Sequence, residues 1–78
     1  MQTEEKVKSI LSELSGEENI KNEAMLQDDL AMDSLSMVSL LIGIEDVFEI
    51  ELNEADMNPF ALGTVQDVVD LVEKYVGE

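Results

Sequence analysis

The side chain with the clearest chemical use is a serine, Ser34, which lies in the run Asp28-Asp29-Leu30-Ala31-Met32-Asp33-Ser34-Leu35. A serine hydroxyl is a poor nucleophile at neutral pH unless a base such as histidine activates it. The chain contains no histidine, no cysteine and no arginine. A self-sufficient hydrolase is therefore disfavoured, and no catalytic residue is predicted. Ser34 is better interpreted as a site that another protein modifies.

Ser34 is predicted to lie at the amino terminus of a helix, after a long loop that leaves its hydroxyl exposed. Either Asp33 or Ser34 can cap this helix, which is how these residue types are usually employed. The free N–H groups and the dipole of a helix amino terminus favour a phosphate at such a place. The neighbouring Asp33 carboxylate opposes a phosphate there, so the helix terminus alone does not decide between a modification site and an ordinary cap.

Apolar periodicity predicts the elements that position Ser34. We expect an all-α bundle of three main helices and one short helix, with a long loop between the first and second helices. The first helix is predicted to begin at an N-cap, Thr3, and to end at Gly16. Its apolar face consists of Val7, Ile10, Leu11 and Leu14. The loop, residues 16–33, carries four apolar anchors, which are Ile20, Met25, Leu26 and Leu30.

The second helix is predicted over residues 34–49 and is apolar around most of its circumference. Such a helix is central to the domain, covered by a partner, or both. Residues 49–52 alternate like a strand, but a lone strand has nothing to pair with. We therefore expect an extended connection that Ile50 and Leu52 pin to the core. A short helix over residues 54–58 follows Asn53, and Pro59 ends it.

The remaining residues predict a turn and a final helix. Phe60, Ala61 and Leu62 are expected to enter the core before Gly63. Thr64 and Asp67 predict a capping box for a helix that runs to about residue 76. Its apolar face consists of Val65, Val68, Val69, Val72, Tyr75 and Val76. The 78 residues are expected to form a single domain, residues 1–78, of marginal stability because so small a chain buries a modest share of its surface.

The charge of the chain is strongly negative, with 19 acidic residues, four lysines and a formal net charge of −15. No basic side chain lies between Lys21 and Lys74. Nucleic acid is excluded as a partner, because its binding needs clustered cations. Anionic membranes are disfavoured for the same reason. Basic patches on other proteins are the expected complement of this surface.

Several other site types are also disfavoured. The absence of cysteine removes disulfides and thiolate metal sites. Asp28, Asp29 and Asp33 do not have the spacing of an EF-hand, so no metal site is predicted. No stretch approaches the roughly 18 apolar residues of a membrane span. The first residues lack the features of a signal peptide, which predicts a cytoplasmic location.

The arrangement of these features resembles the acyl carrier protein family over nearly the whole chain. The resemblance is carried by Asp28-Asp29-Leu30 leading into Asp33-Ser34-Leu35, by Ile44-Glu45-Asp46-Val47-Phe48-Glu49-Ile50-Glu51-Leu52, and by Thr64-Val65-Gln66-Asp67-Val68-Val69. It implies that Ser34, flanked by Asp33 and Leu35, bears a 4'-phosphopantetheine arm. A phosphopantetheinyl transferase, the holo-carrier synthase, would attach the arm from coenzyme A. The terminal thiol of the arm would hold acyl groups as thioesters, for fatty acid biosynthesis or a related pathway.

The resemblance also implies a docking face on the second helix. Leu35, Val38 and Ile42 would form its apolar part, although core packing is an equally good interpretation of these three residues. Its charge would come from Glu45, Asp46 and Glu49. The expected partners are acyl-transferring and chain-elongating enzymes with basic docking patches, met by a monomeric carrier. In the family, the acyl chain can also fold back between the helices, and an interior of Leu, Ile, Val and Met could admit it.

The chain departs from the family pattern near the serine. Ser36 and Ser39 stand where many carriers of fatty acid synthesis have acidic residues, and Ala31-Met32 replaces the more usual Gly-Ala or Gly-Leu. These departures leave open a specialised carrier for polyketide, nonribosomal peptide or aminoacyl chemistry. A further alternative is an acidic helical interaction module that carries no prosthetic group.

Overall fold

The computed structural model describes residues 2–58 and 61–77, apart from the side chain of Gln2. It contains the α-helices α1 (Gln2–Ser15), α2 (Ser34–Phe48) and α3 (Val65–Val76), with a 3-10 helix, η1 (Glu54–Met57), between α2 and α3. The described residues form no strand, only an isolated bridge between Met25 and Thr64. The predicted all-α fold of three main helices and one short helix is confirmed. No helix within the described ranges is long and apolar enough to cross a membrane.

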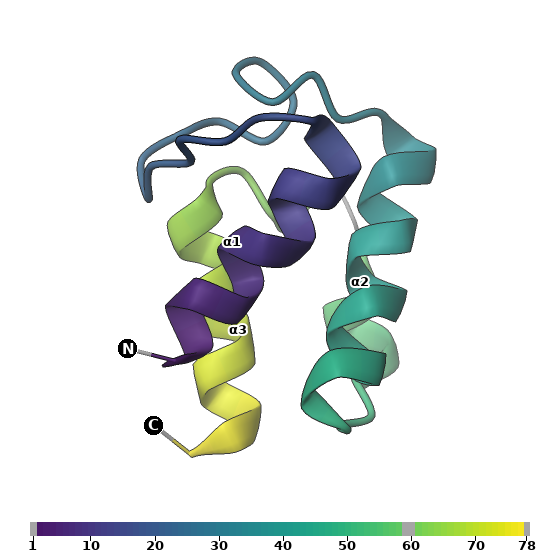
Figure 1. Cartoon of the computed structure of the whole chain (residues 1–78). Coiled ribbons are helices and arrows are strands. Elements are labelled where there is room, and N and C mark those ends of the chain that lie inside the picture. The colour runs from purple at the N-terminus through teal and green to yellow at the C-terminus, as the bar shows by residue number, and fades with distance from the viewer. Residues whose placement is uncertain (1, 59–60, 78) are drawn as a thin grey trace.

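Helix α1 packs against both α2 and α3 (Figure 1). The main core joins these three helices to apolar residues of the loop between α1 and α2, as in Leu11, Leu26, Met37 and Val68. Gly16 ends α1 as predicted, with a φ of 78° and an N–H that donates to the Ser12 carbonyl at 2.8 Å. Glycine adopts this left-handed conformation without steric cost.

The predicted N-cap at Thr3 is wrong. The helix begins at Gln2, so Thr3 already lies within its first turn. Only 2% of Thr3 is exposed, because this residue faces the interior of the bundle. An N-cap residue needs extended backbone geometry outside the helix. The residue type was therefore a misleading signal at this position.

The loop of residues 16–33 is anchored as predicted at Ile20, Leu26 and Leu30, which are all buried. The prediction of Met25 as a fourth buried anchor is wrong, because 41% of this residue is exposed. Met25 holds the loop through its main chain instead: its N–H donates to Asp29 Oδ2 at 2.7 Å, and its carbonyl accepts from the Asp29 N–H at 2.8 Å. This tight turn directs the Met25 side chain outward.

The start of α3 is tied to the same loop. The Leu26 N–H donates to the Gly63 carbonyl at 2.9 Å. The predicted capping box is present: Thr64 Oγ1 accepts from the Asp67 N–H at 3.2 Å, and Asp67 Oδ2 accepts from the Thr64 N–H at 3.0 Å. The N–H groups of Thr64 and then Gly63 hold the pKa of Asp67 below its ordinary value.

A second, smaller apolar cluster joins α2, α3 and the segment between them. It consists of Leu41, Leu52 and Leu71, with Ile50, Met57, Leu62 and Tyr75 packed around them. The predicted extended connection through Ile50 and Leu52 is confirmed, and η1 follows Asn53 as expected.

The prediction for residues 60–62 has a mixed outcome. Pro59 and Phe60 lie outside the described residues. Leu62 is half-buried and packs against both clusters. Ala61 is exposed, so its predicted burial is wrong. A single methyl group gains little from burial, which makes alanine a weak determinant of where the chain turns inward.

Candidate functional site

Ser34 is the first residue of α2, and its side chain is exposed. Asp33 is the N-cap, with extended backbone angles φ −92° and ψ −176°. Its Oδ1 atom accepts a hydrogen bond from the Ser36 N–H at 2.8 Å. This bond, followed by one from the Ser36 hydroxyl, holds the pKa of Asp33 below its ordinary value. Asp33 is therefore an ionised cap at neutral pH, and Ser34 projects from an ordered first turn.

The residues before the cap fix the path of the chain into α2. Met32 is 3% exposed and inserts into the main core. Its N–H donates to the Leu26 carbonyl at 3.0 Å. Ala31 has a φ of 53°, a left-handed conformation that is strained for a residue with a Cβ atom. The turn at Ala31 separates buried Met32 from the loop behind it and carries the chain outward to Asp33 and Ser34.

The surroundings of Ser34 suit modification by another protein better than catalysis. The adjacent carboxylate is engaged as a cap, and the sequence has no histidine. Among the residues that the structure describes, no group of three or more carboxylates could hold a metal ion. An exposed hydroxyl without a base or a metal needs an external enzyme to make it react.

The other serines are less suited to this role. The hydroxyls of Ser12 and Ser15 donate to backbone carbonyls, each at 2.7 Å. Ser36 is half-buried in the first turn of α2, whereas Ser9 and Ser39 are exposed but lie within α1 and α2, away from a helix start. Ser34 alone combines exposure with a place at the start of α2.

The apolar residues predicted for docking lie on the outside of α2. The exposed fractions are 75% for Leu35, 40% for Val38 and 56% for Ile42. At 100° per residue, positions 35, 38 and 42 share one side of the helix. Core packing is therefore not the role of these three residues. The core side of α2 is formed instead by Met37, Leu40, Leu41 and Ile44.

The three predicted acidic residues differ from one another. Asp46 is exposed, and so is Glu49, which is the left-handed C-cap of α2 with a φ of 53°. Glu45 is half-buried, and its Oε2 atom accepts a hydrogen bond from the Leu52 N–H at 2.9 Å. Glu45 thus holds the segment after α2 in addition to contributing charge. The sequence carries no signal for this bond, because it spans seven residues across the end of a helix.

Comparison with known proteins defines the class to which this site belongs. The family model described as the phosphopantetheine attachment site matches residues 5–72. An acyl carrier protein from Thermotoga maritima is 42% identical over 74 residues, which cover 92% of this chain and 89% of the relative. An acyl carrier protein from Buchnera aphidicola subsp. Baizongia pistaciae is 37% identical over 75 residues, 94% of each chain. The chain therefore belongs to the family of phosphopantetheine-bearing acyl carrier proteins.

Family membership defines the general character of the chain. The chain is a carrier and not a catalyst, and its cofactor is 4'-phosphopantetheine bound covalently to a serine. It interacts with a phosphopantetheinyl transferase and with biosynthetic enzymes. Ser34 is exposed at the start of α2, so its side chain has room for this group.

Proposed function

We propose that the chain carries acyl groups on a 4'-phosphopantetheine arm attached to Ser34 and delivers them to enzymes of fatty acid biosynthesis or a related pathway. The observation that supports this function most directly is the exposed Ser34 hydroxyl at the start of α2, in a chain of the phosphopantetheine-attachment family. The arm supplies a terminal thiol, which the polypeptide lacks and which holds acyl groups as thioesters. Residues 1–78 act here as one carrier domain.

Asp33 and Leu35 give the attachment residue two different neighbours. Through its bond to the Ser36 N–H, Asp33 orders the first turn of α2 and so sets the direction in which Ser34 leaves the helix. Leu35 offers an apolar contact beside the hydroxyl, since three quarters of it is exposed. Together they present Ser34 in one orientation to a transferase that uses coenzyme A as the donor of the arm.

The outer side of α2 is the proposed docking face. Its apolar part is formed by Leu35, Val38 and Ile42, and its negative charge by Glu45, Asp46 and Glu49. Exposed charges speed association with a basic patch and make it sensitive to salt, while the small apolar part keeps the complex easy to dissociate. Acyl-transferring and chain-elongating enzymes with basic patches fit this face. A monomer leaves the face free for successive partners.

Enzymatic loading tests the proposed attachment site. Incubation with a phosphopantetheinyl transferase and coenzyme A should raise the mass of the intact protein by one arm. Ser34→Ala should abolish the gain, whereas Ser36→Ala and Ser39→Ala should retain it. An unmodified wild-type chain, under conditions that convert a control carrier completely, would favour an interaction module without a prosthetic group.

A second candidate, a specialised carrier for polyketide, nonribosomal peptide or aminoacyl chemistry, is favoured by the start of α2. The first turn of α2 has no acidic residue, because Ser36 follows Leu35 and the next polar residue is Ser39. Fewer negative charges therefore lie close to the attachment serine than in many carriers of fatty acid synthesis, which changes the set of enzymes that bind well. The mass of the adduct on protein isolated from its own cells separates the two carriers: a fatty acyl mass supports the first, and an aminoacyl or ketide mass supports the second.

The predicted cytoplasmic location stays a prediction.

A further inference from the structure

The loop between α1 and α2 is joined to the amino-terminal end of α3 by main-chain hydrogen bonds. The Leu26 N–H donates to the Gly63 carbonyl at 2.9 Å, and the Val65 N–H donates to the Ala24 carbonyl at 3.1 Å. These two bonds flank the isolated antiparallel bridge described above. A short stretch of the loop is therefore paired with the residues that begin α3, although the two are far apart in sequence.

This pairing also completes the cap of α3. The first N–H groups of a helix have no partner within the helix. In α3, the Val65 N–H is taken up by Ala24, and the Gln66 N–H donates to the Asn22 carbonyl at 2.9 Å. The Asn22 side chain adds a bond from its Nδ2 atom to Gln66 Oε1 at 2.7 Å. The loop and the start of α3 thus hold each other in place.

Leu26 is the residue at which this pairing reaches the attachment end. Its N–H donates to Gly63, while its carbonyl accepts from the Met32 N–H at 3.0 Å. Leu26 and Met32 are both buried in the main core. Met32 directly precedes the cap of α2 and lies two residues before Ser34. A displacement of Gly63 is therefore passed through the main chain of Leu26 to the residue before the cap.

The side chain of Asp67 holds Gly63 in this arrangement. Asp67 Oδ2 accepts from the N–H groups of Gly63 and Thr64, both at 3.0 Å. The Thr64 N–H and the Gly63 carbonyl belong to one planar peptide group and point in opposite directions. Asp67 therefore fixes one side of the peptide group whose other side accepts from Leu26. A Cβ atom at position 63 would lie 3.3 Å from Asp67 Oδ2, so the glycine leaves room for this close approach.

We propose that Asp67 is a positioning residue for the loading of the carrier, which fixes the orientation of Ser34 towards the transferase from the amino-terminal end of α3. The connection runs through the main chain of Gly63, Leu26 and Met32. This inference rests on the proposed function, because it concerns the attachment of the arm.

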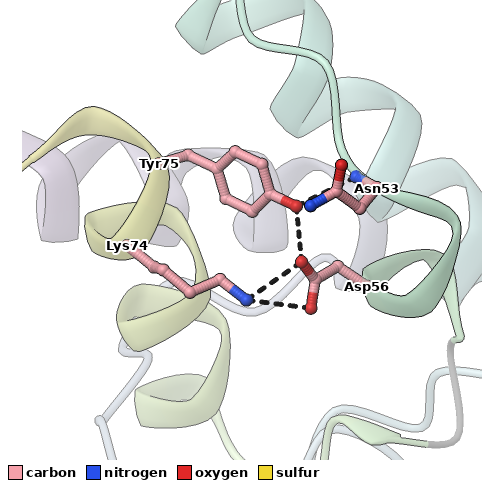
Figure 2. A network of polar contacts seen from close by, with 4 residues as sticks. All are labelled: Asn53, Asp56, Lys74 and Tyr75. Atoms are coloured by element: carbon pink, nitrogen blue, oxygen red, sulfur yellow. Dashed lines mark hydrogen bonds and ion pairs between the residues drawn. The ribbon is translucent and has the colours of Figure 1, made fainter.

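The carboxyl-terminal end of α3 offers a matched control, since an aspartate is bound there in a similar way (Figure 2). Asp56 of η1 accepts from the Tyr75 hydroxyl, and from Lys74 Nζ at 3.0 and 2.9 Å. The Tyr75 hydroxyl in turn accepts from the Asn53 N–H at 2.9 Å. The bonds from Tyr75 and then Lys74 hold the pKa of Asp56 below its ordinary value. These bonds join η1 to the last turn of α3, whereas those of Asp67 lead to the loop before Ser34.

The kinetics of loading by a phosphopantetheinyl transferase with coenzyme A test the proposal. In Asp67→Ala, kcat should fall about three- to tenfold, because even a small displacement of a reacting group is costly. The KM for the carrier should change by less than about twofold, because the docking face of α2 is intact. A variant that only lost stability would show the opposite split, since a smaller folded fraction raises the apparent KM and leaves kcat at saturation unchanged.

Two further variants sharpen this measurement. Asp67→Asn keeps an acceptor oxygen and should retain most of the wild-type kcat. Gly63→Ala crowds the Asp67 carboxylate without removing it, so it should lower kcat by about twofold and serves if Asp67→Ala does not fold. Asp56→Ala, the matched control, should leave kcat unchanged. An unchanged kcat in both Asp67→Ala and Gly63→Ala would overturn the proposal, and so would an equal loss of kcat in Asp56→Ala.

Amide hydrogen exchange of the unmodified protein tests the connection without loading, because the Leu26 and Met32 amides are themselves donors in it. Asp67→Ala should lower the protection of both amides by about three- to tenfold, in line with the loss of one hydrogen bond. The Leu11 amide in α1 should be unaffected. Unchanged protection at Leu26 would overturn the connection, and so would an equal loss at Leu11, since that pattern reports global unfolding.

The two measurements separate this inference from the proposed function. If the wild-type chain loads and kcat in Asp67→Ala is unchanged, the positioning role fails and the carrier function stands. If the wild-type chain cannot be loaded at all, the carrier function and the positioning role both fail.

Discussion

The two ends of α2 are built in opposite ways. At the attachment end, the hydrogen bonds come from residues close in sequence: the Asp33 carboxylate accepts from the Ser36 N–H, and the Met32 N–H donates to the Leu26 carbonyl. After the carboxyl-terminal end of α2, a hydrogen bond joins residues far apart in sequence, because Tyr75 Oη of α3 accepts from the Asn53 N–H. The hydrogen bonds next to the attachment serine are therefore local, whereas those that hold the segment after α2 depend in part on the packing of α3.

The largest expected effect comes from breaking the attachment end. Met32→Ala should lower the free energy of unfolding by about 2–5 kcal/mol, because it leaves a cavity in the main core. Leu52→Ala, after the opposite end of α2, should lower it by an amount near the lower limit of this range, since the cluster of Leu52 is smaller. Urea denaturation measures both. Met25→Ala, at an exposed methionine of the same loop, should change stability by about 0.5 kcal/mol or less.

Similar costs for Met32→Ala and Met25→Ala would contradict the view that Met32 anchors the attachment end. Such a result would also mean that the position of Ser34 is set by its cap alone.

The backbone offers a matched pair of substitutions, because Ala31 and Glu49 have the same φ of 53° at the two ends of α2. Glycine removes the steric cost of this conformation but increases the entropy of the unfolded chain. Ala31→Gly should therefore raise the free energy of unfolding by about 0.5–1 kcal/mol. Glu49→Gly should raise it further, because it also removes a negative charge from the negative end of the helix dipole.

Thermal and urea denaturation of both glycine variants measure the difference. Ala31→Ser, which keeps a Cβ atom, serves as the control and should not be stabilised. A loss of stability in Ala31→Gly would contradict the prediction, because it would show that the left-handed conformation of Ala31 costs less than the added entropy of the unfolded chain.

The smallest expected effect is the pH dependence of stability that comes from the Asp33 cap. The charged form of Asp33 is favoured in the folded state, since hydrogen bonds hold its pKa below the ordinary value. Its contribution to stability is therefore present above the pKa of the unfolded chain and is lost as the pH falls through the lower folded pKa. The gap in melting temperature between wild type and Asp33→Ala should be constant near neutral pH and should close only as the pH falls below the ordinary aspartate pKa of about 3.9.

Asp28→Ala is the control for that comparison, because it removes an equal charge from an exposed residue of the same loop. The control matters because the net charge of −15 makes any lost carboxylate relieve repulsion. A gap for Asp33→Ala that stayed constant into acid would mean that the ionised cap does not stabilise the attachment end.

Much of the fold could be predicted from local patterns. Three features were predicted from groups only a few residues apart, so that a short stretch of sequence contains both partners. They are the capping box of Thr64 and Asp67, the end of α1 at Gly16 and the N-cap at Asp33. The exposed position of Ser34 followed from the cap and the loop before it. Its role as attachment residue came from the family resemblance and stays a prediction until loading is measured.

Two of the failed predictions, those for Thr3 and Met25, share a physical cause. Thr3 and Met25 were assigned from residue type, yet the packing of α1 buries the threonine and the turn closed by Asp29 turns the methionine outward. Whether Leu35, Val38 and Ile42 faced the core or solvent could not be decided from the sequence either. A helix that is apolar on most sides does not reveal which side its neighbours will cover.

The sequence by itself determined which segments form helices, the caps at Asp33 and Thr64, and which hydroxyl stands at a helix start, because those features depend on contacts within one or two turns. Only the tertiary structure decided which side of α2 stays exposed and that Glu45 of α2 and Tyr75 of α3 accept hydrogen bonds from the neighbouring N–H groups of Leu52 and Asn53. Hydrogen bonds between groups as distant as Asn53 and Tyr75 depend on how whole helices pack. No periodicity or spacing along the chain encodes that arrangement in a readable form.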